Sequence, residues 1–359
     1  MQTNAAPSIN VQQQPRQRRT VKSILGLLGS LIFLGAALYV LDWQALQQTL
    51  ATINPWLFAL AVCIVLIEMV TMNLRWHELI KQLVPLSLTQ HMQHFFYGMF
   101  LNTFTPPNMG GDAYRIMVLG AHAPGKLAVV VGLVRERLLG ILGLFGFYLV
   151  CLGGGLVSKP AEKLGDAQTL FVAVGLLIVI ASIGILLAPV VLDRLATWAA
   201  SRLSARLAVA LRHGSAAMHF SSRRVFIRLF GLSLLTVWLW VLTVQIIALD
   251  LGVHMSWQTL GLIVVLVELV RSLPVSIQGI GVREGAYAYL FSRLGEASET
   301  GFILGMISYL ALSVAIVVTG VVGFGCQVVA KRRRHVHKEG DSKEPAPRRT
   351  PREHTTSYP

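Results

Sequence analysis

Charged residues are scarce in this 359-residue chain: Asp, Glu, Lys and Arg together make up only 13% of it, and just 17 residues are acidic. An average soluble domain carries roughly 25% charged residues. Apolar residues make up 54% of the chain, and its mean hydropathy is +0.62. The shortage of charge therefore excludes an ordinary soluble domain and indicates a membrane protein.

Motifs that mark several other functional classes are also missing. The three cysteines, Cys63, Cys151 and Cys326, all lie inside apolar runs, which excludes a disulfide framework or the ligand spacing of a zinc site. No Walker A sequence occurs, and the glycines of "GIGVREG" do not have the spacing of a dinucleotide-binding loop. We therefore expect no nucleotide, no other cofactor and no metal ion.

The basic residues, 31 against 17 acids, are concentrated in three segments. The chain up to Ser23 has four bases and no acid, Val190–Arg228 has seven arginines against Asp193, and the tail from Lys331 has nine bases against four acids. Basic segments beside membrane spans are typical of cytoplasmic loops, and they also attract anionic lipid. This distribution argues against a nucleic-acid partner.

Apolar runs predict the membrane spans. A crossing helix needs about 20 apolar residues. Six runs are long enough: Ile24–Leu41, Trp56–Leu74, Leu127–Leu156, Leu170–Leu192, Leu229–Leu249 and Phe302–Ala330. The first run has no small-residue cleavage site and is longer than a signal-peptide core, so we interpret it as an uncleaved span.

Two further apolar regions, residues 91–120 and 259–294, are interrupted near their middle by proline and glycine. If each enters the membrane and returns to the same side, every arginine-rich loop and both termini become cytoplasmic. We therefore predict an all-α, polytopic integral membrane protein with six full transmembrane helices and two broken re-entrant hairpins. Its predicted segments are a disordered basic N-terminus (1–23), two membrane halves (24–156 and 157–330) and a disordered basic tail (331–359).

The two halves follow one plan of span, span, broken hairpin, span. Each half crosses the membrane an odd number of times, so the halves are inverted relative to each other. Inverted repeats with interrupted segments in corresponding positions indicate a transporter whose binding site lies near the bilayer midplane.

The first interruption, "NTFTPPNMGGDAYR" (Asn102–Arg115), predicts the chemistry of the site. Pro106 breaks the helix, and Gly110 and Gly111 allow positive φ or close approach of another group. A helix that restarts near Asp112 would direct free N–H groups into the cavity, with Arg115 one turn later, and such helix ends bind anions. The second interruption repeats these parts with Pro274, Gly279, Gly281, Arg283 and Glu284. Together they predict a slot of positive potential that suits a phosphate-bearing lipid headgroup.

Charged residues inside the apolar regions support this interpretation, since each costs roughly 2.5–3.5 kcal/mol at the bilayer centre unless it has a partner or water. Glu136 and Arg137 fall within the third run, and Glu268 and Arg271 share a helix face in the second broken region. Glu68 stands alone in the second span, with Arg75 near its cytoplasmic end.

Four elements in fixed order resemble the lysylphosphatidylglycerol synthase transmembrane region family: "LRWHELI", "GMFLNTFTPPNMGGDAYR", "VRERLLG" and "LPVSIQGIGVREGAYAYL". The resemblance implies a flippase-like, multi-helix domain that moves lipids between leaflets of the bacterial inner membrane. Its characteristic positions correspond to Asn102, Pro106, Gly111, Asp112, Arg115, Glu136, Arg137, Gly281, Arg283 and Glu284. Asn108-Met109 departs from the family's usual glycine-rich turn. Because no aminoacyl-transfer domain follows Lys331, we do not expect the chain to make lysylphosphatidylglycerol by itself.

We therefore expect a translocator, not an enzyme, that moves an anionic phospholipid or a polyprenyl- or glycolipid-linked molecule between leaflets. Facilitated diffusion and proton coupling through Glu136, Glu284 or Asp112 both fit the sequence. The alternative is a membrane transferase, or an accessory subunit, in glycolipid, hopanoid or aminoacyl-lipid biosynthesis, with a carboxylate such as Asp112 as general base. A separate lipid-modifying enzyme is a further expected partner.

Overall fold

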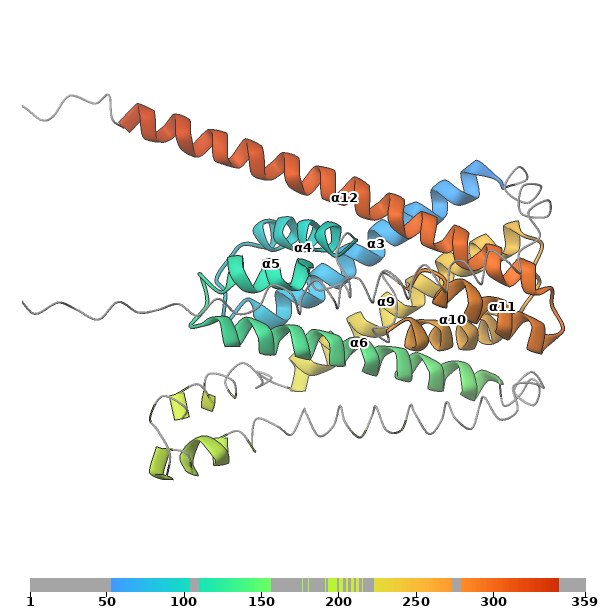
Figure 1. Cartoon of the computed structure of the whole chain (residues 1–359), viewed down its shortest axis with the longest axis horizontal. Helices are drawn as coiled ribbons and strands as arrows, with labels where there is room; N and C mark the ends of the chain where they lie inside the picture. The colour runs from blue at the N-terminus through green and yellow to red at the C-terminus, as the bar shows by residue number, and fades with distance from the viewer. Residues whose placement is uncertain are drawn as a thin grey trace, which may run out of the picture.

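The computed structural model describes residues 53–103, 110–155, 223–272 and 279–341, with scattered positions between 176 and 215 (Figure 1). Every regular element named in these ranges is an α-helix. They are α3 (Pro55–Ile80), α4 (Leu88–Thr103), α5 (Gly110–Leu119), α6 (Lys126–Gly155), α9 (Arg223–Asp250), α10 (Trp257–Arg271), α11 (Val282–Leu294) and α12 (Ser298–Asp341).

Local sequence explains where these helices begin and end. Asn54 is the N-cap of α3: its side chain accepts a hydrogen bond from the Trp56 N–H at 2.9 Å, and Pro55 occupies the first helical position, where no N–H is needed. Ser256 caps α10 in the same way through the Thr259 N–H. Gly295 ends α11 in the left-handed conformation, with φ of 82°.

Helices α3, α6, α9 and α12 lie on four of the predicted spans, and both interrupted regions are broken helix pairs. The first region forms α4 and α5 on either side of residues 104–109, and the second forms α10 and α11 on either side of residues 272–281. The predicted spans Ile24–Leu41 and Leu170–Leu192 lie outside the continuously described residues, so the total of six spans remains a prediction.

Three of the described helices are long and apolar enough to cross a membrane: Pro55–Ile80, Arg223–Asp250 and Ser298–Val321. Helix α6 has 30 residues, about 45 Å at 1.5 Å per residue, but it carries charges in its first half. Helix α12 continues to Asp341, into the tail for which the sequence predicts disorder from residue 331. Lys, Arg and Glu are good helix formers, and no proline occurs in this extension.

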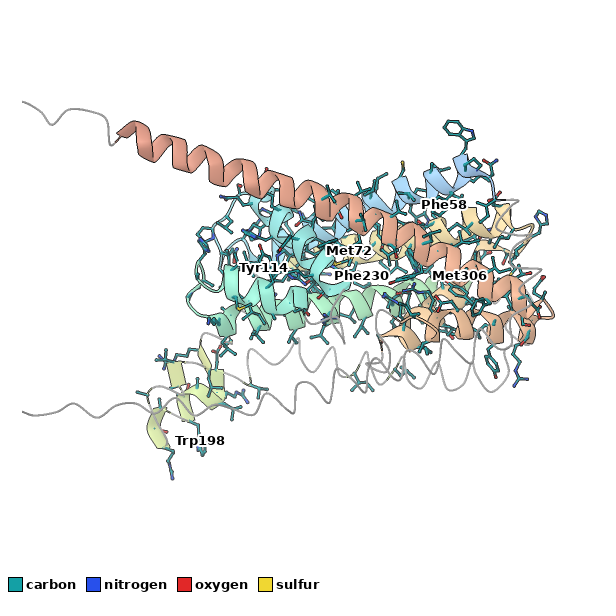
Figure 2. All side chains as sticks on the ribbon, turned by 45° about the horizontal axis from the view of Figure 1, so that its top comes forward. Phe58, Met72, Tyr114, Trp198, Phe230 and Met306 are labelled. Carbon is teal, nitrogen blue, oxygen red and sulfur yellow. The ribbon has the colours of Figure 1, made fainter. Side chains whose placement is uncertain are left out.

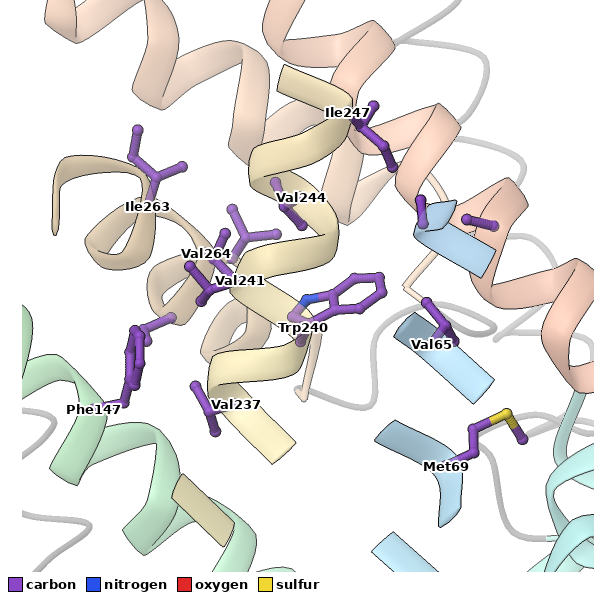
Figure 3. Packing of buried hydrophobic residues seen from close by; sticks show 14 of the residues in the cluster. Val65, Met69, Phe147, Val237, Trp240, Val241, Val244, Ile247, Ile263 and Val264 are labelled. Atoms are coloured by element: carbon purple, nitrogen blue, oxygen red, sulfur yellow. The ribbon is translucent and has the colours of Figure 1, made fainter. Parts of the chain in front are cut away.

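Helices α3 and α9 run antiparallel and are joined near both ends. At one end, the Asn54 N–H donates to Asp250 Oδ2 at 3.0 Å. At the other, Arg228 forms an ion pair of 3.4 Å with Glu78. Between them the side chains of Val65, Met69 and Trp240 fill the interface (Figure 3). The start of α3 and the end of α9 therefore lie at the same end of the bundle.

Helix α6 runs parallel to α9. Gly143 of α6 lies against Ser233 of α9, and Phe147, further along α6, meets Gly261 of α10 beside Val241, which is further along α9. A Cβ atom on Gly143 would lie 2.7 Å from the Ser233 Cβ, so the two backbones approach closely at this glycine. Helix α3 therefore runs in one direction and α6 and α9 run in the other, as the loop charges predict.

The broken pairs lie at opposite ends of the bundle (Figure 1). Helices α4 and α5 lie near the end where α6 begins, whereas α10 and α11 lie near the end where α12 begins. Figure 2 shows the same separation, with Tyr114 of α5 and Met306 of α12 far apart. Helix α4 packs on α12, and α10 packs on α6. Each pair thus enters the bundle from its own end.

Candidate functional site

The first cluster of charges joins α5 to α6. Arg115 donates to Asp112 Oδ1 at 2.7 Å and to Glu136 Oε2 at 3.0 Å, and Arg137 donates to the second oxygen of Asp112. Arg115 is only 5% exposed and Glu136 only 6%, whereas the Arg137 side chain is 61% exposed. The cluster is therefore a balanced network of two arginines and two carboxylates with one arginine at its surface.

Aromatic rings cover the inner face of this cluster. The Arg115 guanidinium lies 4.7 Å from the Trp76 ring centroid and 5.4 Å from that of Phe95. A planar guanidinium stacks well on aromatic faces and still donates from its edge. These contacts stabilise a buried cation that two carboxylates also neutralise.

The N-terminus of α5 is held by an amide from α4. The Gly111 N–H donates to Asn102 Oδ1 at 2.7 Å, so Asn102 caps a helix to which it does not belong. A Cβ atom on Gly111 would lie 1.9 Å from the Gly98 carbonyl oxygen. Gly110 and Gly111 are absent from the positive-φ glycines of the described residues, so Gly111 serves close approach and not an unusual φ.

The second cluster lies on α10 and α11. Arg271 donates to Glu268 Oε2 through both Nε, at 2.8 Å, and Nη2. Gly279 has φ of 75°, and a Cβ atom there would lie 2.3 Å from the Arg271 Cγ. Gly279 therefore allows both the turn and the position of the Arg271 side chain.

The side chain of Glu284, in the first turn of α11, occupies the N-terminus of that helix. Glu284 Oε2 accepts from the Gly281 N–H at 2.6 Å, and Gly281 has φ of 80°. Arg283 is fully buried with its guanidinium 4.7 Å from the Tyr309 ring centroid. Since Asn102 and Glu284 already occupy the two helix ends, an incoming anion would have to displace them or bind the arginines directly.

Helix α3 links the two clusters with Arg75 and Glu68, which lie two turns apart on one face. Arg75 is 4% exposed and donates to the Ser233 hydroxyl of α9 at 3.0 Å. Its charged neighbours are Glu136 of the first cluster and Glu68. The charged neighbours of Glu68 are Arg75 and, in the second cluster, Glu268 and Arg271. A line of charge therefore runs from α6 through α3 to α10.

Comparison with known proteins identifies the family. The lysylphosphatidylglycerol synthase TM region pattern matches residues 23–324, most of the chain. The chain belongs to this family. The lysylphosphatidylglycerol synthase TM region and the apolar helices together make it an integral membrane protein related to lipid modification or translocation. No curated protein and no solved structure matches it.

The structure brings most of the predicted site residues into two groups. The first holds Asn102, Gly110, Gly111, Asp112, Arg115, Glu136 and Arg137, and the second holds Glu268, Arg271, Gly279, Gly281, Arg283 and Glu284. Pro106 and Pro274 lie outside the described residues. Among the described residues, no three His, Cys, Asp or Glu side chains are placed to hold a metal ion.

The sequence did not place Glu68, Arg75, Trp76 and Tyr287 in this candidate site. Glu68 and Arg75 were visible as isolated charges in a span, and their spacing of seven residues puts them on one helix face. Nothing in the sequence marks Trp76 and Tyr287 as site residues, because buried aromatic side chains are common in any membrane core. Only packing places them beside the arginines.

Proposed function

We propose that the protein translocates an anionic phospholipid, or a polyprenyl- or glycolipid-linked molecule, between leaflets of the bacterial inner membrane. The observation that carries the proposal is the pair of broken helix hairpins at opposite ends of the bundle, each of which has an arginine–carboxylate ion pair and a buried arginine. A lipid phosphate would replace the carboxylates on Arg115 and Arg271 and would also bind Arg283, while its acyl chains stay in the bilayer.

Electrostatics supports exchange of partners at these arginines. Each described arginine cluster is nearly balanced by its own carboxylates, so the empty site carries little net charge. Phosphate is a strong bidentate acceptor for guanidinium groups and competes well with a carboxylate. The exposed Arg137 would meet the headgroup first, before it reaches the buried Arg115.

We also propose an inverted repeat, in which α3, α4–α5 and α6 correspond to α9, α10–α11 and α12. Matched packing supports it. Helix α4 of the first half packs on α12 of the second, and its counterpart α10 packs on α6 of the first. Likewise α6 packs on α9, and its counterpart α12 packs on α3. In inverted-repeat transporters one half rocks against the other around a central site. The two hairpins would then expose the site to opposite leaflets in turn.

Transport of a fluorescent phosphatidylglycerol across liposomes tests the function. We expect Arg115→Ala and Arg283→Ala to lower the rate at least tenfold, because loss of one buried charge-assisted contact costs about 1.5–3 kcal/mol. Arg293→Ala is the matched control, since Arg293 is exposed and contacts only Tyr289 among the described side chains. Wild-type rates in both buried-arginine variants would refute the site.

The biosynthetic alternative predicts a different phenotype. If the protein were a transferase or its accessory subunit, a deletion strain would lack one lipid species. A translocator would leave the lipid inventory intact and change its distribution between leaflets. Mass spectrometry of total lipid, with chemical labelling of the outer leaflet, separates these outcomes.

A further inference from the structure

Glu68 is a carboxylate without an ion pair in the part of the chain that the structure describes. Its side chain is half-buried overall, but Oε2 is inaccessible and has no hydrogen-bond partner. An isolated carboxylate ion is costly at such a position, and the group is neutralised by a proton instead. The geometry therefore favours a protonated Glu68.

A second carboxylate, Glu268 of α10, is among the charged neighbours of Glu68. Glu268 is 8% exposed and uses only Oε2 for Arg271, while its Oε1 is buried without a partner. The charged groups that face Glu68 are Glu268 and Arg271 from α10, and Arg75 from α3 itself. Glu268 also faces Arg283 and the Tyr287 hydroxyl of α11.

The carboxylates that the sequence favours for proton coupling are all engaged. Asp112 and Glu136 bind Arg115, and Glu284 binds the Gly281 N–H. Glu68 and Glu268, by contrast, each keep one buried carboxylate oxygen without a hydrogen-bond partner, Oε2 in Glu68 and Oε1 in Glu268. These two oxygens are the places where a proton can be held inside the bundle.

We propose that Glu68 and Glu268 form a proton-binding site that couples proton movement to lipid movement, an inference that rests on the proposed function. At rest Glu68 carries one proton, and Glu268 is ionised against Arg271. When a lipid phosphate captures Arg271, Glu268 loses its counter-ion and takes up a second proton. Charge balances in both states: Glu268 with Arg271 before binding, and phosphate with Arg271 beside two neutral acids afterwards. One proton is therefore bound with each phosphate and released with it.

Infrared difference spectroscopy tests the resting proton without any transport measurement. The purified wild-type protein is expected to show the carbonyl stretch of a buried protonated carboxylic acid at neutral pH, and Glu68→Gln removes it. Glu296→Gln, at an exposed position after α11, keeps the band. Absence of the band in wild type, or its persistence in Glu68→Gln, overturns the proposal even if lipid transport is observed.

Proton uptake on lipid binding tests the second step. Phosphatidylglycerol added to detergent-solubilised protein in weakly buffered solution is expected to remove about one proton from solution per lipid bound, read with a pH indicator. Glu268→Gln binds the lipid without uptake. The result is the same in sodium and potassium salts; a requirement for sodium, or equal uptake by Glu268→Gln, overturns the proposal. If phosphatidylglycerol binds but is not transported, the translocator proposal fails and the proton site stands.

Discussion

At the scale of single residues, the protein is distinguished by arginine buried in a membrane bundle. Arg75, Arg115 and Arg283 are 4%, 5% and 0% exposed. Each has a partner of a different kind: a hydroxyl for Arg75, carboxylates for Arg115 and an aromatic face for Arg283. Charged groups at this depth are expensive and mark functional sites, because they persist only where partners offset the desolvation.

Gly111 provides a residue-scale prediction. In Gly111→Ala the new methyl group collides with the Gly98 carbonyl, and a backbone atom cannot move aside as a side chain can. We expect a loss of about 1–3 kcal/mol, as for other overpacked positions. Thermal unfolding in detergent, followed by tryptophan fluorescence, measures it. Gly125→Ala is the control, since a Cβ there meets nothing within 4 Å; equal stability of both variants would contradict the packing of α4 on α5.

At the scale of helices, we propose that the α3–α9 pair is the scaffold and that the broken pairs are the parts that move. The scaffold is joined by polar contacts near both ends and by apolar packing between them. Helix α4 instead meets α12 through a close apolar contact, in which a Cβ on Gly320 would lie 2.9 Å from the Phe100 Cβ. Alternating access then requires the hairpins to shift along this second kind of surface.

Cross-linking tests this division of roles. In a chain whose native cysteines are replaced by alanine, a Glu78→Cys/Arg228→Cys pair joined by a bifunctional thiol cross-linker locks α3 to α9, and transport of fluorescent phosphatidylglycerol should be unchanged. An oxidised Phe100→Cys/Gly320→Cys pair locks α4 to α12 and should stop transport until the disulfide is reduced. If only the cross-linked Glu78→Cys/Arg228→Cys variant lost transport, the moving helices would be α3 and α9 and not the hairpins.

At the scale of the whole molecule, helix directions determine which surfaces share a side of the membrane. The start of α3 and the end of α9 meet at one end, and the end of α3 and the start of α9 meet at the other. The arginine-rich loop lies before α9, and the base-rich extension ends α12. From the positive-inside rule we propose that the second end is cytoplasmic.

Accessibility labelling checks this orientation. We expect a membrane-impermeant thiol reagent to label His254→Cys in intact cells, because His254 is exposed in the loop after α9. Lys81→Cys, exposed after α3, and a cysteine at Ser342 should react only after the membrane is permeabilised. Labelling of Ser342→Cys together with His254→Cys in intact cells would refute the placement of the tail.

Much of the architecture was predictable because the bilayer imposes simple local rules. Run length predicted α3, α6, α9 and α12, and clustered proline and glycine predicted the breaks between α4 and α5 and between α10 and α11. The (i, i+3) spacing of Glu268 and Arg271 predicted a shared helix face, and in the structure the two side chains form an ion pair. Each of these features depends on a short stretch of chain.

The sequence by itself determined a helical membrane protein with two interrupted segments, because hydropathy, helix breakers and loop charge act locally. Only the tertiary structure decided the partners: that Glu136 meets Arg115, that Arg137 lies at the surface, and that Arg75 and Glu68 connect the clusters. Their positions along the chain do not specify these pairs. Packing of α3 against α6, α9 and the hairpins brings them together, and the cost of burying unpaired charge then selects which groups meet.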